Sequence, residues 1–239
     1  MNTVHPTAIV GDGVQMGDGN VIGPWAVIAA GTRLGSDNWI GAGCVIGGLP
    51  EIRGYPHPAD WIEQAGEFGV VIGDGNVIRE QVTISRGSRR QTRVGGSCFL
   101  MTRVQLAHDV ELSDGVTCAL GAILAGHVRL GQAGNVGAAA VVHQFRVIGP
   151  GAMVGQGSVV TRDVPPFAKV HGNPARLHGA NQVGMTRQGI PPQAIQTLES
   201  CYAAAPAPSG DGAPLCEPPE PMPAALAPQA EWWQQARRN

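Results

Sequence analysis

Aliphatic residues recur at every sixth position along most of the first 160 residues, and the residue after each is often Gly or Ala. This period fits neither an amphipathic helix, in which apolar positions recur every 3.6 residues, nor a single alternating strand. It is a known repeat period of parallel β-helices. The positions that fit are Val4, Val10, Met16, Ile22, Ile28, Leu34, Ile40 and Ile46, then Ile72, Ile78 and Ile84, and then Val94, Leu100, Leu106, Leu112, Cys118, Leu124, Leu130, Val136, Val142, Ile148, Val154 and Val160.

Each hexad predicts one flat side of a three-sided coil, so residues 18 apart should stack from coil to coil. The aliphatic residue points inward, and the residue four later shares a crowded corner that favours small side chains. Those corner positions begin Ala8, Val14, Asn20, Ala26, Thr32, Asn38 and Cys44. The 23 hexads predict an all-β solenoid of seven to eight coils.

Composition narrows the class of protein. With 35 Gly and 19 Pro the chain is a poor helix former, and Gly has no period of three, which excludes collagen. No stretch approaches 18 consecutive apolar residues, and the first residues lack the pattern of a signal peptide, so we expect a cytoplasmic protein with no stable membrane insertion. A net charge of −2 gives no electrostatic footprint for nucleic acid.

The five cysteines are scattered and odd in number, which predicts core residues in a reducing compartment. Cys44 and Cys98 fall on corner positions, and Cys118 falls on an inward position. Neither disulfides nor metal ligands are therefore expected from them.

Two segments interrupt the period, residues 47–71 and residues 85–93. Loops leave a solenoid at its corners and often carry its binding surface, although a neutral surface excursion is the simpler alternative. The second loop holds four arginines in eight residues, a pattern that suits a phosphate or an acidic carrier protein. These arginines are Arg86, Arg89, Arg90 and Arg93.

The C-terminal part differs from the repeat, and we divide the chain into a β-helix domain, residues 1–175, and a partly helical segment, residues 176–239. A helix is predicted over 184–202, because two prolines precede apolar residues at helical spacing. From Ala203 the Pro-rich sequence predicts a flexible or extended linker. The last ten residues predict a short helix whose two tryptophans dock on a surface.

Three histidines lie in the later part of the repeat, namely His108, His127 and His143. In coils of 18 residues, His127 stacks over Asp109 and His143 over Ala125, which places all three histidines near one corner. Core packing does not require polar residues there. Histidine exchanges protons near neutral pH, and a neighbouring carboxylate can orient the ring and stabilise its cationic form. The pattern predicts an acid–base site, with solvated surface histidines as the alternative.

Several motifs, taken in order, resemble one enzyme family. They are VHPTAIV at the start, IREQVTISRGS at 78–88, LAHD at 106–109, LAGHV at 124–128, VHQF at 142–145, DVPPFAKVHGNPARLHGAN at 163–181 and GMTRQGI at 184–190. Together they resemble the acyl-[acyl-carrier-protein]–UDP-N-acetylglucosamine O-acyltransferases of lipid A biosynthesis, over roughly residues 1–200. The resemblance implies a left-handed parallel β-helix, although most crossover connections between parallel strands are right-handed.

The resemblance also implies a homotrimer that transfers an acyl group from an acyl carrier protein to a hydroxyl, or an amine, of a nucleotide sugar, without any cofactor beyond the thioester substrate. His108 would be the general base, Asp109 its orienting carboxylate, and the Gly126 N–H the oxyanion donor. The substrate-binding residues implied are His127, His143, Gln144, Gln105, Gln156, Asn181 and Arg187. Acyl transfer of this kind needs a base, which contributes roughly 10²–10⁴ in rate, and donors aimed at the developing oxyanion.

The chain departs from the family pattern at several positions. Gln105 stands where the family has a second histidine, and Ser85 where a histidine is common. The first loop reads GLPEIRGY where the family has a sequence like GDPQDLKY, so Arg53 would substitute for a lysine. Gln156 stands near the implied acyl groove, which predicts a short or medium acyl chain.

Other functions fit parts of the pattern. The segment VVTRDVPPFAKVHGNPAR also resembles acetyl-CoA-dependent sugar acetyltransferases. A non-catalytic scaffold or sugar-binding β-helix is a further alternative, which the set of His108, Asp109 and Gly126 disfavours. A zinc hydratase is also possible on this fold, but its histidines typically include a pair five residues apart, whereas here the gaps are 19 and 16. We therefore expect no metal.

Overall fold

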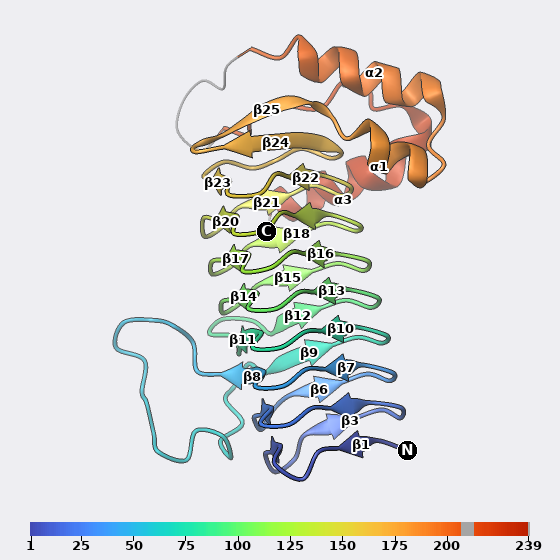
Figure 1. Ribbon diagram of the computed structural model, residues 1–239. Helices are drawn as coiled ribbons and strands as arrows, with labels where there is room; N and C mark the ends of the chain where they lie inside the picture. The colour runs from blue at the N-terminus through green and yellow to red at the C-terminus, as the bar shows by residue number, and fades with distance from the viewer. Residues whose placement is uncertain (207–212, 239) are drawn as a thin grey trace.

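The computed structural model describes residues 1–206 and 213–238, and the fold that it shows is a left-handed parallel β-helix (Figure 1). Short strands wind upward from the N-terminus, and a β-hairpin with helices lies at the other end (Figure 1). Among the described residues, no helix is long and apolar enough to cross a membrane. The predicted fold class is confirmed.

The strands form three sheets, one on each side of the coil, which we name A, B and C; their strands pair in parallel, except in the antiparallel hairpin that ends sheet A. Sheet A contains β1 (Thr3–Val4), β4 (Val21–Ile22), β7 (Trp39–Ile40), β10 (Val77–Ile78), β13 (Phe99–Leu100), β16 (Thr117–Cys118), β19 (Asn135–Val136), β22 (Met153–Val154), β24 (Ala168–Gly172) and β25 (Ala175–Ala180). Sheet B contains β2 (Ile9–Val10), β5 (Val27–Ile28), β8 (Val45–Gly48), β11 (Thr83–Ser85), β14 (Gln105–Leu106), β17 (Ile123–Leu124), β20 (Val141–Val142) and β23 (Val159–Val160). Sheet C contains β3 (Gln15–Met16), β6 (Arg33–Leu34), β9 (Val70–Ile72), β12 (Thr92–Val94), β15 (Glu111–Leu112), β18 (Arg129–Leu130) and β21 (Val147–Ile148).

Strand register confirms the hexad pattern. Leu106 pairs with Leu124, 18 residues later. Across the first break Ile40 pairs with Ile78, so the loop adds 20 residues to one coil (38 − 18). Across the second break Ile78 pairs with Leu100, so that loop adds four (22 − 18). The loops therefore leave the coil without changing which residues face the core.

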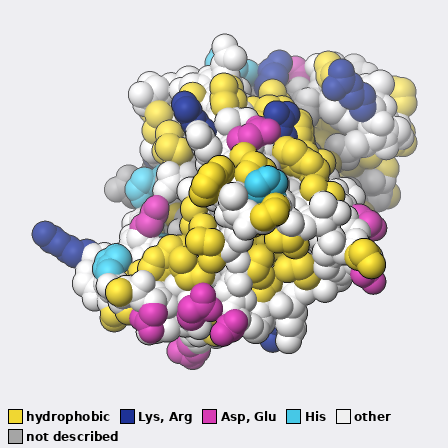
Figure 2. All heavy atoms as spheres, turned by 60° about the horizontal axis from the view of Figure 1, so that its bottom comes forward, with side chains coloured by type: hydrophobic (Ala, Val, Ile, Leu, Met, Phe, Trp, Pro, Cys, Tyr) yellow, Lys and Arg dark blue, Asp and Glu magenta, His cyan; other side chains and the backbone are white. Residues whose placement is uncertain are grey.

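The inward positions form one continuous core, in which residues from Ile22 to Val160 are almost completely buried. The first coil is the exception: Val4 is 43% exposed because no further coil covers that end of the solenoid. Figure 2 views the molecule from this end and shows hydrophobic side chains spread over it. A fully buried Leu, Ile or Val contributes roughly 1.5–3 kcal/mol through the hydrophobic effect, so the stacked coils supply most of the stability.

Buried asparagines stack along one corner and carry hydrogen bonds from coil to coil. The Asn20 side-chain oxygen accepts from the backbone and the amide of Asn38 at 3.0 Å each. Asn38 does the same for Asn76, and Asn76 accepts from the Cys98 N–H. Because the side-chain oxygen of each of these three asparagines has a donor, they leave no unpaired amide oxygen in the core.

The cysteines agree in part with the expectation. All five lie within the described residues and are free. Cys44, Cys98 and Cys118 are buried, and burial raises the pKa of the Cys44 and Cys98 thiols to about 11. Cys201 and Cys216 are only half-buried, and they pack against the edge of the core.

The C-terminal part corrects two predictions. The single helix predicted over 184–202 is two helices, α1 (Gln182–Arg187) and α2 (Pro192–Ala203). They are separated because Pro191 and Pro192 cannot continue a preceding helix and instead begin a new one. The prediction of a linker is wrong for residues 213–226, which pack against the solenoid through Leu215 and Leu226. The part of that linker at 207–212 lies outside the described residues.

The predicted terminal helix is confirmed as α3 (Ala227–Arg238), which follows the short 3₁₀ helix η1 (Ala224–Leu226). Trp233 is 2% exposed, so it is docked as expected. The helix contacts β21, and the Ala236 carbonyl accepts a hydrogen bond from Arg129 at 3.0 Å. The C-terminal helix therefore lies on the outer face of sheet C.

The long first loop is held by Arg86. This arginine is 2% exposed and donates to the carbonyls of Gly47, Trp61 and Gln64. Burial lowers the pKa of its guanidinium. The prediction that Arg86 belongs to a surface cluster for anions is wrong, because its guanidinium is committed to backbone carbonyls of residues 47–64.

Candidate active site

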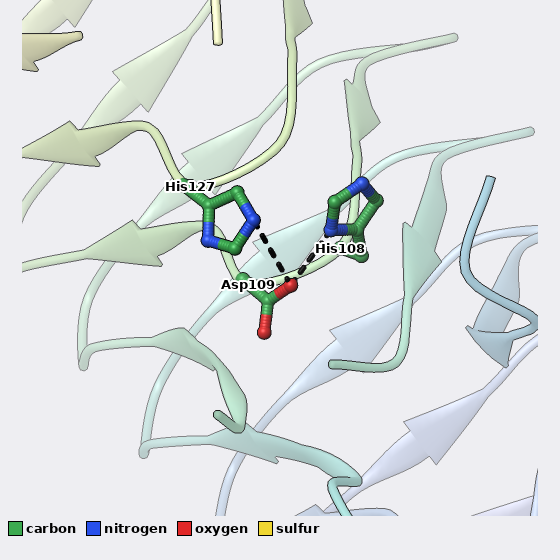
Figure 3. Close-up of side chains that lie close together, drawn as sticks. All are labelled: His108, Asp109 and His127. Carbon is green, nitrogen blue, oxygen red and sulfur yellow. Dashed lines mark hydrogen bonds and ion pairs between the residues drawn. The ribbon is translucent and has the colours of Figure 1, made fainter. Parts of the chain in front are cut away.

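The corner between sheets B and C brings three ionisable side chains together. His108 and Asp109 lie in the turn between β14 and β15, and His127 lies one coil later, between β17 and β18. His108 Nδ1 is 2.7 Å from Asp109 Oδ2, and His127 Nε2 is 3.6 Å from the same oxygen. The two rings approach the carboxylate from opposite sides (Figure 3). The 18-residue register predicted this group.

Asp109 is completely buried and is held by the second loop. Its Oδ1 accepts the backbone N–H groups of Ser88, Arg89 and Arg90 at 2.8–3.0 Å, and its Oδ2 accepts the Ser88 hydroxyl at 2.6 Å. Burial raises the pKa of Asp109, but the hydrogen bonds, of which the Ser88 hydroxyl makes the largest contribution, leave the pKa well below its usual value. The carboxylate is therefore ionised at neutral pH and acts only as an acceptor.

The charge on Asp109 fixes the proton arrangement of His108. Because the carboxylate can only accept, Nδ1 of His108 must donate, and Nε2 of the neutral ring is left without a proton. In Figure 3 this second nitrogen points away from Asp109. His108 keeps 14% of its side chain exposed, so Nε2 can receive a proton from a molecule bound at the corner.

Gly126 lies directly against the His108 ring. A Cβ at this position would be 2.6 Å from Cε1 and 2.8 Å from Nε2 of His108, closer than real Cβ contacts allow. Only glycine leaves room for the ring in this position. Within the described residues, the Gly126 N–H has no hydrogen-bond acceptor, and Gly126 lies one coil after His108, against the ring that carries the free nitrogen. A base and an uncommitted backbone donor thus lie side by side.

Three corner residues in consecutive coils adopt the left-handed conformation, at φ values of 63° for Asp109, 64° for His127 and 62° for Phe145. Asp and His tolerate this region, whereas it is unusual for Phe. The Phe145 ring stacks on His127 with centroids 4.4 Å apart and planes 6° apart. Burial lowers the pKa of His127, and His108, Arg90 and Arg89 lower it further against the opposing charge of Asp109. His127 is therefore mainly neutral at physiological pH.

Of the other predicted residues near this corner, His143 and Gln144 are exposed and Gln105 is half-buried. His143 and Gln144 lie one coil above His127, and His143 Nδ1 contacts the Gln144 carbonyl at 3.1 Å, so His143 does not join the cluster. Gln105 lies on β14 and donates to both carboxylate oxygens of Glu51 in the first loop, at 2.8 and 2.9 Å. Gln105 thus connects the first loop to the strand that precedes His108.

Three predicted residues lie elsewhere in the protomer. Gln156 is exposed at the corner between sheets A and B. Asn181 caps α1: its side-chain oxygen accepts from Gly184 N–H, and its amide donates to the Gly151 carbonyl. Arg187 is exposed in the last turn of α1. Gln156 could therefore share a substrate site with His108 only if it came from a second copy of the chain.

The cluster also has donor atoms of the kind that bind metals. One ligand atom each from His108, Asp109 and His127 lie within 4.8 Å of one another. However, both oxygens of Asp109 already accept hydrogen bonds, four of them from the second loop. A metal would also face Arg89 and Arg90, whose charges act on His127. The donor set therefore fits a proton-transfer site better than a cation site.

The sequence pattern did not identify Ser88, Phe145 or the backbone cradle around Asp109. The second loop adds four residues to its coil, so counting in steps of 18 cannot place Ser88 beside Asp109. Phe145 had a usable signal, because it lies 18 residues after His127 and must occupy the same corner column.

Comparisons with known proteins identify similar acyltransferases. A family model described as Udp N-acetylglucosamine O-acyltransferase, domain 2, matches residues 163–206. An acyl-[acyl-carrier-protein]–UDP-N-acetylglucosamine O-acyltransferase from Alkalilimnicola ehrlichii is 45% identical over 134 residues, 55% of this chain and 52% of that protein. The solved structure of a UDP-N-acetylglucosamine acyltransferase from Campylobacter jejuni superposes with a TM-score of 0.72 and 30% identity, over 87% of this chain and 86% of the other.

The chain belongs to the UDP-N-acetylglucosamine acyltransferase family. A relative from Halorhodospira halophila with the same name as the Alkalilimnicola protein is 42% identical over 160 residues, 66% of this chain and 59% of the relative. The matches thus span little more than half the length of these curated relatives. Family membership explains the β-helix and the closing segment β24–α2.

Proposed function

We propose that this chain is an acyltransferase that moves an acyl group from an acyl carrier protein thioester to a hydroxyl of UDP-N-acetylglucosamine. The names of its relatives supply the two substrates. The observation that carries the proposal is the pair of His108 and Asp109, in which Nδ1 is fixed at 2.7 Å and Nε2 is free beside Gly126. This is the arrangement of an oriented general base.

The proposed reaction has two proton transfers. Nε2 of His108 takes the proton of the sugar hydroxyl while its oxygen attacks the thioester carbonyl carbon. The negative charge moves to the carbonyl oxygen, where the Gly126 N–H donates a hydrogen bond, a contribution of about 3 kcal/mol in comparable sites. The tetrahedral intermediate then expels the thiolate, which receives the proton from the His108 imidazolium. Asp109 stabilises the charged ring throughout.

We further propose that the protein is a homotrimer with His108 close to the subunit interface. The outer faces of sheets A and B carry apolar side chains that are more than a third exposed, among them Trp39 and Val77 on sheet A and Ile123 on sheet B. The outer face of sheet C instead carries charges such as Arg33 and Glu111. Exposed apolar surface of this kind is typical of protein interfaces.

The test is an acyl-transfer assay with UDP-N-acetylglucosamine and carrier-bound acyl chains, in which the product is identified by mass. His108→Ala should keep its oligomeric state and lose about 10²–10⁴ in kcat. His5→Ala is the matched control, because His5 is exposed at the far end of the solenoid. Near-normal turnover by His108→Ala, or no product from the unmodified protein with any carrier, would refute the proposal.

A further inference from the structure

A cavity of about 470 Å³ lies between the active-site corner and the C-terminal helix. On one side it is bounded by His127 and Phe145, and on the other by Ala236 and Arg237 of α3. It is therefore formed partly by the second loop and the solenoid and partly by the C-terminal segment. The cavity lies within one coil of His108, so a molecule bound at His108 can extend into it.

The lining of this cavity is strongly basic. Five guanidinium groups line it together with one carboxylate. The lining charges belong to Arg89, Arg90, Arg129, Arg146, Arg237 and Asp163. Close placement of like charges is unfavourable without a counterion, because each guanidinium keeps its charge at any physiological pH.

Three of these arginines have partners, and two lack an acidic one. Arg146 and Arg237 are 3.5 and 3.6 Å from the two oxygens of Asp163, and Arg129 is 3.5 Å from Glu111. Within the part of the chain that the structure describes, neither Arg89 nor Arg90 forms an ion pair.

Arg90 is nevertheless fixed in place. Its guanidinium donates to the carbonyls of Asp109 at 3.2 Å and His127 at 3.4 Å. Because its backbone N–H also binds the Asp109 carboxylate, the side chain starts from a rigid point at the active-site corner. Arg89 is exposed beside it and has room to reach a bound group. Two guanidinium donors, of which Arg90 is preorganised, thus line the cavity without an acidic partner.

We propose that this cavity binds a phosphate ester of a substrate, with Arg89 and Arg90 as its principal ligands. Guanidinium groups match phosphate oxygens with two parallel hydrogen bonds, and a phosphate supplies the charge that the lining lacks. This inference rests on the proposed function, in which both substrates carry phosphate: a diphosphate in the nucleotide sugar and a phosphodiester in the pantetheine arm of the carrier.

The experiment measures binding by isothermal titration calorimetry at low salt, on the full chain, with UDP and with 4′-phosphopantetheine as separate probes. The variants are Arg89→Gln and the double variant Arg89→Gln/Arg90→Gln. Arg33→Gln is the matched control, since Arg33 is exposed on the same sheet C at the other end of the solenoid. Each lost charged hydrogen bond should weaken binding about tenfold.

Weaker binding of UDP alone assigns the cavity to the nucleotide diphosphate, and weaker binding of 4′-phosphopantetheine alone assigns it to the donor arm; either result supports the proposal. Dissociation constants that match the Arg33→Gln control for both probes overturn it. Turnover of the unmodified protein separates the two proposals. Acyl product with arginine-independent binding removes the phosphate site only, whereas arginine-dependent binding without product removes the proposed reaction only.

Discussion

Gly126→Ala is the substitution that most directly tests how the active-site corner works. The added methyl would lie 2.6 Å from Cε1 and 2.8 Å from Nε2 of His108. Ordinary carbon contacts are about 3.5–4.0 Å, so the imidazole must move by about 1 Å. Gly126 does not have a positive φ, so alanine can adopt its backbone conformation without strain.

The expected loss of activity follows from this displacement. A shift of about 1 Å in a reacting group can cost roughly 10²-fold in rate. The backbone N–H remains in the variant, so the loss would come from the position of Nε2 and not from the oxyanion donor. Replacing glycine with alanine at a compatible position stabilises the fold by about 0.4–1 kcal/mol through the unfolded state, so the melting temperature should not fall appreciably.

The assay is steady-state acyl transfer, with the melting temperature and oligomeric state measured on the same sample. We expect kcat to fall about 100-fold in Gly126→Ala. Gly48→Ala is the control, because its added methyl would meet only Val45 Cγ1, at 3.7 Å. If Gly126→Ala keeps a kcat within a few-fold of the unmodified protein, the His108 ring does not need its observed position and the reasoning fails.

Three other predictions concern the carboxylate, the C-terminal helix and the acyl groove. Burial of Asp109 raises its pKa, but the hydrogen bonds outweigh burial and hold the pKa below its unfolded value of 3.8. The ionised carboxylate therefore stabilises the fold above that pH, and this stabilisation disappears as the pH falls further. The melting-temperature difference between the unmodified protein and Asp109→Asn should therefore shrink from about pH 6 to about pH 3, and a constant difference would contradict the assigned shift. Trp233→Ala should reduce the free energy with which α3 docks by about 3 kcal/mol. Amide hydrogen exchange in α3, measured by mass spectrometry, should then become about 10²-fold faster. Unchanged protection of these amides would show that the ring contributes little. Gln156→Gly should shift the preferred acyl chain to greater length in a panel of acyl carriers, whereas an unchanged optimum would remove Gln156 from the groove.

The sequence predicted the solenoid because its structure is local and periodic. The pairing of Leu106 with Leu124 follows from counting, since every coil without a loop has the same length. The C-terminal segment has no such period. Its prolines favour extended chain in isolation, but Leu215 and Leu226 join the hydrophobic core of the solenoid, and tertiary packing overrides local preference.

The active-site cluster was predictable to the same extent as the register. His127 stacks near Asp109 because no loop separates them along the chain. Ser88 and Arg90 were not predictable as ligands of Asp109, because the second loop changes the coil length just before that corner. The burial of Arg86 was not predictable either. The four arginines of the second loop look equivalent in sequence, and only the structure separates the buried Arg86 from those at the cavity.

Left-handed residues do not by themselves mark the active site. They occur at the other corners too, including Arg103, Ala133 and Ala139. What distinguishes the corner between sheets B and C is its position between two different surfaces. Sheet B carries exposed apolar residues on one side, and the charged face of sheet C lies under α3 on the other. A second copy of the chain packed on sheet B would enclose His108 from one side, while α3 and its basic cavity enclose it from the other. The same two elements would then control access to the base: subunit contact on the sheet B side, and the C-terminal helix on the side that faces the arginines.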